Sequence, residues 1–184
     1  MMSRRLSRVL WAAALILLGA ALMAFNRPDA APAPAAYASD APEGYEPGQQ
    51  LPDFTIALTD GASFSLSEHR GQVTVINLWA TWCTPCVNEL PHFDRLQREH
   101  SDDVAVLAIH SDLITDDVAA YLANYDYGIA FAGDEGGQVI ASVGGSTMLP
   151  QTLVLDRYGV VTYNQVGSVT YEALEELVAA AMAE

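Results

Sequence analysis

The sequence is short of positive charge and contains no lysine. Its eight basic residues are all arginines, and it has 23 acidic residues, which gives a formal net charge of -15 and a pI of about 4.3. Such a surface repels the phosphates of nucleic acid, and no basic stripe interrupts it. We therefore expect no nucleic-acid partner.

Cysteine is scarce as well, since Cys83 and Cys86 are the only two in the chain. A structural zinc site needs four ligands, and no second cysteine pair is present to complete one. Haem attachment needs a histidine directly after the pair, where this chain has Val87. A thiol peroxidase needs a lone cysteine at a longer spacing from a threonine than Thr81 provides. A purely stabilising disulfide is disfavoured too, because so short a loop restricts the unfolded chain very little.

The N-terminus holds Arg4, Arg5 and Arg8 without any acid, and the uncharged residues 9–25 follow. Their number lies at the short end of a spanning helix, ~17–25 residues, and exceeds the ~7–15-residue apolar core of most signal peptides. We expect residues 1–8 in the cytoplasm, residues 9–25 as a single-pass signal anchor, and the remainder outside the cytoplasm. A cleaved signal peptide is the alternative, with Ala36-Tyr37-Ala38 as a candidate cleavage site.

The chain then divides into a linker and one domain. Residues 26–50 are rich in proline and alanine and have almost no large aliphatic side chains. This composition is typical of an extended, disordered tether, so we expect a single folded domain over residues 51–184.

Within that domain, strand-like and helix-like patterns alternate. A first hairpin is expected from residues 54–58 and 63–66, around the turn-forming Asp60-Gly61. The pattern then predicts strands over 73–80, 104–109 and 129–132, helices over 84–99, 116–124 and 138–143, a hairpin of 152–155 with 160–164, and a last helix over 171–183. This order predicts an α/β domain with a mixed sheet and helices on both faces.

The two cysteines stand where the predicted strand 73–80 gives way to a helix. If the helix begins at Cys83, that sulfur lies beside unpaired backbone N–H groups and the positive end of the helix dipole, which both stabilise a thiolate. Cys86 is then the more buried thiol, able to cleave a mixed disulfide formed by Cys83. Pro85 between them stiffens the first turn. Trp82 either contacts a bound peptide or packs within the fold.

The stretch from Asn77 to Pro91, N-L-W-A-T-W-C-T-P-C-V-N-E-L-P, closely resembles a known active-site segment. It is similar to that of the membrane-anchored thioredoxin-like proteins, the TlpA, ResA and CcmG types of bacterial thiol–disulfide oxidoreductase. The resemblance extends to Leu51-Pro52-Asp53-Phe54 and to the L-P-Q-T-L-V-L-D of residues 149–156. It implies a thioredoxin-like fold, with a central mixed sheet flanked by helices and an N-terminal hairpin extension.

The resemblance also assigns roles. Cys83 matches the nucleophile, Cys86 the resolving cysteine, and Pro150 a cis-proline that lies against the dithiol. With Trp82, Pro85 and Leu149, this proline is expected to contact the substrate.

Glu89 and Asn77 are two polar residues within the stretch that resembles the active-site segment. Glu89 matches an acid beside the active site and is a candidate acceptor for the Cys86 proton. Its alternative is an ordinary exposed helix glutamate. Asn77 occupies the strand position at which cytoplasmic thioredoxins have a buried acid. The resemblance therefore does not assign the proton-relay role of that acid to Asn77.

The resemblance implies an extracytoplasmic enzyme of the bacterial cell membrane that exchanges disulfides with protein substrates. It is expected to act as a reductase, to take electrons from a membrane thiol transporter, and to serve apocytochrome c among its substrates. Beyond the redox-active Cys83–Cys86 pair we expect no cofactor and no metal. The alternative is a Cu(I)-carrying module, since two thiolates suffice for Cu(I) and His110 is a candidate third donor. Otherwise His110 is expected to lie on the surface at a strand end.

Overall fold

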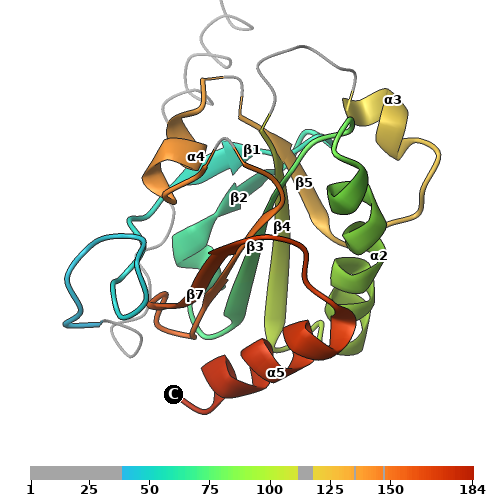
Figure 1. The fold of residues 1–184 in the computed structure, drawn as a ribbon. Helices are drawn as coiled ribbons and strands as arrows, with labels where there is room; N and C mark the ends of the chain where they lie inside the picture. The colour runs from blue at the N-terminus through green and yellow to red at the C-terminus, as the bar shows by residue number, and fades with distance from the viewer. Residues whose placement is uncertain (1–38, 112–117, 135, 147) are drawn as a thin grey trace, which may run out of the picture. The chain divides into compact units, whose positions relative to one another are not determined.

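A mixed five-stranded sheet forms the centre of the protein, in the order β5-β4-β3-β6-β7 (Figure 1). The strands are β3 (Val73–Trp79), β4 (Val104–His110), β5 (Ala130–Gly133), β6 (Gln151–Leu155) and β7 (Val161–Val166). Strands β3, β4 and β5 run parallel, whereas β6 is antiparallel to both β3 and β7. This computed structural model describes residues 39–111, 118–134, 136–146 and 148–184.

The two central parallel strands are buried along their whole length. Both are nearly continuous apolar runs, VTVINLW and VAVLAIH, because each has side chains packed on both faces of the sheet. The sequence pattern predicted both strands, which end within one residue of the expected positions.

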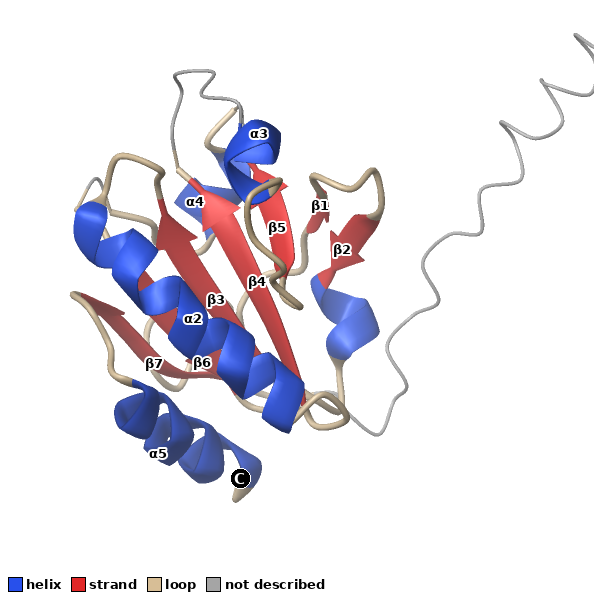
Figure 2. Ribbon diagram, turned by 90° about the vertical axis from the view of Figure 1, so that its right-hand side faces the viewer, coloured by secondary structure: helices blue, strands red, loops and turns tan. Residues whose placement is uncertain are grey.

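Helices α2 (Thr84–Glu99) and α5 (Tyr171–Met182) cover one face of the sheet (Figure 2). In α2 the buried apolar side chains recur every three residues at Leu90, Phe93 and Leu96, which gives the helix one apolar side. They join one core cluster with Val75 and Val106 of the sheet. The short α3 (Val118–Leu122) also packs against this cluster, and the part of its predicted range before Val118 lies outside the described residues.

The other face carries the hairpin of β1 (Thr55–Ala57) and β2 (Ser63–Ser65), the 3-10 helix η2 (Leu66–His69) and α4 (Gln138–Ser142). The hairpin is a separate two-stranded antiparallel sheet, as predicted. Its turn needs the glycine at Gly61, where φ is +90°. Ile56, Phe64 and Val143 belong to the second core cluster, on this face. The α/β prediction with helices on both faces is therefore confirmed.

Backbone pairing with the sheet begins before Leu51, where the sequence placed the domain boundary. Gly48 donates a backbone hydrogen bond to Val161 at 2.8 Å, and Val161 donates one to Gln49 at 2.8 Å. These bonds pair Val161, the first residue of the edge strand β7, on the side of the strand that does not face β6. Composition alone indicated a tether here because it carries no information about such backbone pairing.

The predicted basic segment, anchor and first part of the tether, residues 1–38, lie outside the described residues. Within the described ranges, no helix combines the length and apolar character needed to cross a membrane.

Candidate active site

Cys83 is the N-cap of α2, at the end of the loop that leaves β3. Its Sγ accepts a hydrogen bond from the Cys86 backbone N–H at 3.4 Å, and the two sulfurs are bonded at 2.02 Å. Exposure is 5% for Cys83 and 0% for Cys86. The capping position supplies a backbone N–H and the positive end of the helix dipole to the Cys83 sulfur, as the sequence predicted.

The residues around the pair are open to solvent. Trp82 is 62% exposed, so it does not pack as a core residue, and Pro85 is exposed in the first turn of α2. Proline is tolerated there because the first N–H groups of a helix have no intrahelical acceptor. By contrast Trp79, at the end of β3, is fully buried. The exposed surface beside the dithiol is therefore partly apolar.

Glu89 is buried, with 2% of its surface exposed, so the alternative of an ordinary exposed glutamate is wrong. It follows Cys86 by three residues in α2 and hence lies on the same side of the helix. Its Oε1 accepts a hydrogen bond from Asn77 Nδ2 at 2.9 Å, and its Oε2 accepts one from the Val169 N–H at 3.1 Å. The carboxyl group of this α2 residue is thus held by two groups, one from β3 and one from the segment before α5.

Burial of the carboxyl group raises the pKa of Glu89 to about 7, although the bonds from Val169 and Asn77 act in the opposite direction. Desolvation penalises the charged carboxylate more than two hydrogen bonds favour it. A carboxyl group with a pKa near neutrality can both accept and return a proton at physiological pH. Glu89 is therefore chemically suited to exchange a proton with a thiol one helical turn away.

The Leu149–Pro150 peptide bond is cis, in agreement with the resemblance. Leu78 pairs with Gln151 in the antiparallel register, which places Pro150 opposite the end of β3, where the loop to Cys83 begins. The Pro150 carbonyl accepts a hydrogen bond from Gly167 at 2.8 Å. Leu149 is half-buried and packs against both core clusters. The sheet thus brings the late proline to the dithiol end of the molecule.

His110, at the end of β4, is buried with 2% exposure, so the expected surface position is wrong. Its Nε2 accepts a hydrogen bond from the Thr81 N–H at 3.2 Å, and its ring meets Trp79 edge to face. The backbone N–H of Ser111 also donates to the Trp79 carbonyl at 2.9 Å, which ties the ends of the two strands together. The Nε2 of His110 is therefore engaged within the fold, and the copper-carrying alternative stays a prediction.

Three potential metal ligands, Glu99, His100 and Glu175, come together among the described residues. They lie at the end of α2 opposite to the dithiol. Glu99 already pairs with Arg95 at 2.9 Å and accepts a hydrogen bond from Tyr171, which also donates to Glu175 at 2.8 Å. The cluster is a surface network of charged and phenolic groups and has no contact with the reacting sulfurs.

Sequence reasoning missed the partners of Glu89. The buried amide of Asn77 in an apolar strand was a signal, because buried polar groups need hydrogen-bond partners. The Val169 N–H gave no signal, since it is a backbone group 80 residues away from Glu89. It becomes a partner only through the packing of α5 against α2.

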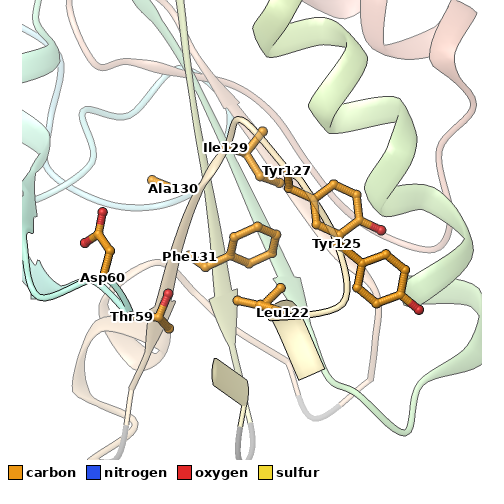
Figure 3. Close-up of a pocket in the computed structure, with 8 residues that line it drawn as sticks. All are labelled: Thr59, Asp60, Leu122, Tyr125, Tyr127, Ile129, Ala130 and Phe131. Atoms are coloured by element: carbon orange, nitrogen blue, oxygen red, sulfur yellow. The ribbon is translucent and has the colours of Figure 1, made fainter. Parts of the chain in front are cut away.

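A small cavity of about 200 Å³ lies apart from the dithiol (Figure 3). It is bounded by Tyr125, Tyr127 and Phe131 on one side and by Asp60 on the other. The rings of Tyr127 and Phe131 have centroids 5.7 Å apart and continue the aromatic packing around Trp79. None of the site residues predicted from the sequence lines this cavity.

A dithiol that caps a helix and a cis-proline at the facing strand end, on a mixed sheet with helices on both faces, define a thioredoxin-like protein. Residues 46–181 match the Redoxin family. The thioredoxin-like protein YneN of Bacillus subtilis is 33% identical over 136 residues, 72% of this chain and 79% of the relative. The thiol-disulfide oxidoreductase ResA of Bacillus thuringiensis is 30% identical over 135 residues, 73% and 78% of the two chains.

Two solved structures of thiol-disulfide or thioredoxin-family proteins are also similar to this chain. A Chlorobium tepidum protein assigned as the thiol:disulfide interchange protein DsbE has a TM-score of 0.68 and 30% identity, over 75% of this chain and 99% of its own. A second protein of that organism, of the thioredoxin family, shares the fold with a TM-score of 0.63 at 24% identity, over 78% and 99% of the two chains. The chain therefore belongs to the Redoxin family, as a thioredoxin-like thiol–disulfide oxidoreductase.

Proposed function

We propose that the protein is an extracytoplasmic reductase that passes electrons from the Cys83–Cys86 dithiol to disulfides of protein clients, apocytochrome c among them. The observation that carries the proposal is the pairing of a helix-capping Cys83 with a buried Glu89 one turn beyond Cys86. The first favours a thiolate nucleophile and the second supplies a proton acceptor for the resolving thiol. Neither group needs a cofactor or a metal for this reaction.

The reaction consists of two exchanges. The Cys83 thiolate attacks one sulfur of the client disulfide, so a Cys83–client bond forms, the client S–S bond breaks, and the other client sulfur leaves as a thiolate. Cys86 then gives its proton to Glu89, and its thiolate attacks the Cys83 sulfur. The Cys83–Cys86 bond forms and the second client thiolate leaves. The client gains two electrons, its thiolates take protons from Glu89 and solvent, and the protein becomes the disulfide.

The N-terminal sequence supports the proposed position in the cell. Residues 9–25 would hold the chain in the bacterial cell membrane, with the arginine-bearing residues 1–8 in the cytoplasm and the domain outside. A membrane thiol transporter would then return electrons to the Cys83–Cys86 disulfide. Alkaline phosphatase fused to the C-terminus, which is active only outside the cytoplasm, tests this arrangement. An inactive fusion would contradict it.

Client reduction is tested with the reduced full-length protein and apocytochrome c whose haem-site cysteines are joined in a disulfide. We expect client thiols to appear, no reaction from Cys83→Ser, and a trapped mixed disulfide from Cys86→Ser. The reductase assignment would be excluded if the Cys83–Cys86 disulfide oxidised reduced apocytochrome c and the equilibrium lay on the side of the oxidised client.

A further inference from the structure

A cavity of about 390 Å³ lies beside the dithiol, at the ends of the three parallel strands. Trp82, Ser111 and Asp134, which follow β3, β4 and β5, form one side of it. The other side comes from α4 and from the residues before the cis-proline; its members are Gly136, Gly137, Ile140, Ala141, Gly145, Ser146 and Leu149. In Figure 1 this is the upper end of the sheet, where α4 lies. Ligands of open α/β sheets commonly bind in this place.

Small residues form much of the lining of the cavity, Gly145 among them. Gly145 donates a backbone hydrogen bond to Ile140 at 2.7 Å, and a Cβ on Gly145 would lie 2.3 Å from Ile140 Cγ2. The chain therefore returns close to α4 without a side chain that could fill the space. The volume lies within the ~300–1,000 Å³ usual for ligand pockets and is ample for one long side chain.

The walls nearest the dithiol are apolar. Trp82 lines the cavity at 62% exposure, and Met148, the neighbour of the lining residue Leu149, is 65% exposed. These are the two most exposed large apolar side chains among the described residues. Trp82 directly precedes Cys83 and Met148 lies two residues before the cis-proline, so exposed apolar surface at these positions indicates a surface that is covered while a client is bound.

Asp134 is the only charged residue among the described residues that line the cavity. Its Oδ2 accepts a hydrogen bond from the Ile140 N–H at 2.8 Å, which fixes the carboxylate at the start of α4. No arginine is among the described residues that line the cavity, and Arg98 and Arg157 bond to Asp94 and Met182 elsewhere. With a formal net charge of -15 on the chain, the cavity attracts cations and repels anions.

We infer that this cavity binds a lysine or arginine side chain of the client, located next to the client cysteine that Cys83 attacks. The aliphatic stem lies against Trp82 and Leu149, and the cationic end reaches Asp134. An acidic residue at the same place is rejected. This inference rests on the proposed function and adds the substrate class, an oxidised protein segment with a basic residue beside its cysteine.

The test uses the reduced full-length protein and three synthetic disulfide peptides that differ only in the residue beside the attacked cysteine, which is Arg, Gln or Glu. The measured quantity is the second-order rate constant of exchange. We expect the order Arg, Gln, Glu, with Arg about tenfold faster than Glu. The Asp134→Asn variant, whose amide oxygen still accepts from Ile140, should lower that ratio about fivefold.

Two control variants separate this site from general effects. Glu176→Gln, at an exposed position of α5, removes one charge elsewhere and should leave the ratio unchanged. Ala141→Phe fills the cavity and should slow the Arg peptide several-fold, whereas Ala180→Phe on α5 should not. If Asp134→Asn and Glu176→Gln have the same ratio, the inference is wrong although exchange continues. If no peptide reacts with the reduced protein, it is the proposed function that fails.

Discussion

Asn77 of β3 donates a hydrogen bond to the Glu89 carboxyl group of α2, with 2.9 Å between Nδ2 and Oε1. Both residues are buried, and cytoplasmic thioredoxins carry an acid at the strand position that Asn77 occupies. Two buried acids here would repel each other, whereas an amide can donate to the one acid present. Among the described residues, the site therefore holds a single buried carboxyl group, tied to the strand that leads into the dithiol loop.

The first prediction concerns stability. The pKa of Glu89 rises from 4.5 in the unfolded chain to about 7 in the fold, so its protonated form favours folding below pH 4.5 and this contribution is lost as pH rises through 7. The loss amounts to about 3 kcal/mol at most. Glu89→Gln should remove this pH dependence. Urea unfolding of the full-length oxidised protein at pH 5 and pH 8 measures it, and equal pH dependence in both proteins would contradict the assignment.

The second prediction concerns the resolution step. In the wild type, the rate at which Cys86 resolves a mixed disulfide should rise as pH passes through about 7, because Glu89 loses its proton there. In the Glu89→Gln variant this rise of the rate with pH should disappear. Near neutral pH, Cys86 should resolve the mixed disulfide about 100-fold more slowly than in the wild type, a usual contribution of a general base. Stopped-flow measurement of the mixed disulfide gives the rate. The matched Glu176→Gln variant should keep the wild-type profile, and a Glu89→Gln profile identical to it would exclude the proton-transfer role.

His110 gives a third prediction, since its Nε2 accepts the Thr81 N–H in the loop before the dithiol. His110→Phe removes the acceptor, so hydrogen exchange of the Thr81 amide should speed up about fivefold, which corresponds to about 1 kcal/mol for one hydrogen bond. His110→Asn offers an amide oxygen and should restore part of the protection. Amide exchange followed by NMR measures both variants. Unchanged Thr81 exchange in His110→Phe would show that the bond does not hold the loop.

A fourth prediction tests the close approach of Gly145 to α4 beside the cavity. Gly145→Ala places a Cβ 2.6 Å from the Ile140 carbonyl oxygen and should destabilise the fold by about 1–3 kcal/mol. Gly133→Ala is the control, because a Cβ there meets nothing within 4 Å and should change stability by about 0.5 kcal/mol or less. Free energies of unfolding for the two variants should therefore differ clearly. Equal values would contradict the described packing of Gly145 on α4.

Much of the fold was predictable because its signals are local. The apolar runs of β3 and β4 specify buried strands, and the spacing of Leu90, Phe93 and Leu96 specifies the side of α2 that packs. The dithiol at the junction of strand and helix is equally local. These features depend on neighbouring residues alone, so the sequence pattern contains them.

The unpredicted features depend on contacts between distant segments. The bond from Val169 to Glu89 and the bond from Thr81 to His110 involve backbone N–H groups, which every residue type except proline provides. The pairing of Gln49 with Val161 is of the same kind. The cavity beside Trp82 needs the relative positions of three strand ends and α4, which no single stretch of sequence encodes.

The most direct measurement is the reduction potential of the Cys83–Cys86 pair in the full-length protein, determined by equilibration with thiol buffers of known potential. A reductase should have a potential closer to that of thioredoxin, ~-270 mV, than to that of the strong oxidant DsbA, ~-120 mV. A value near ~-120 mV would contradict the proposal that the protein reduces its clients.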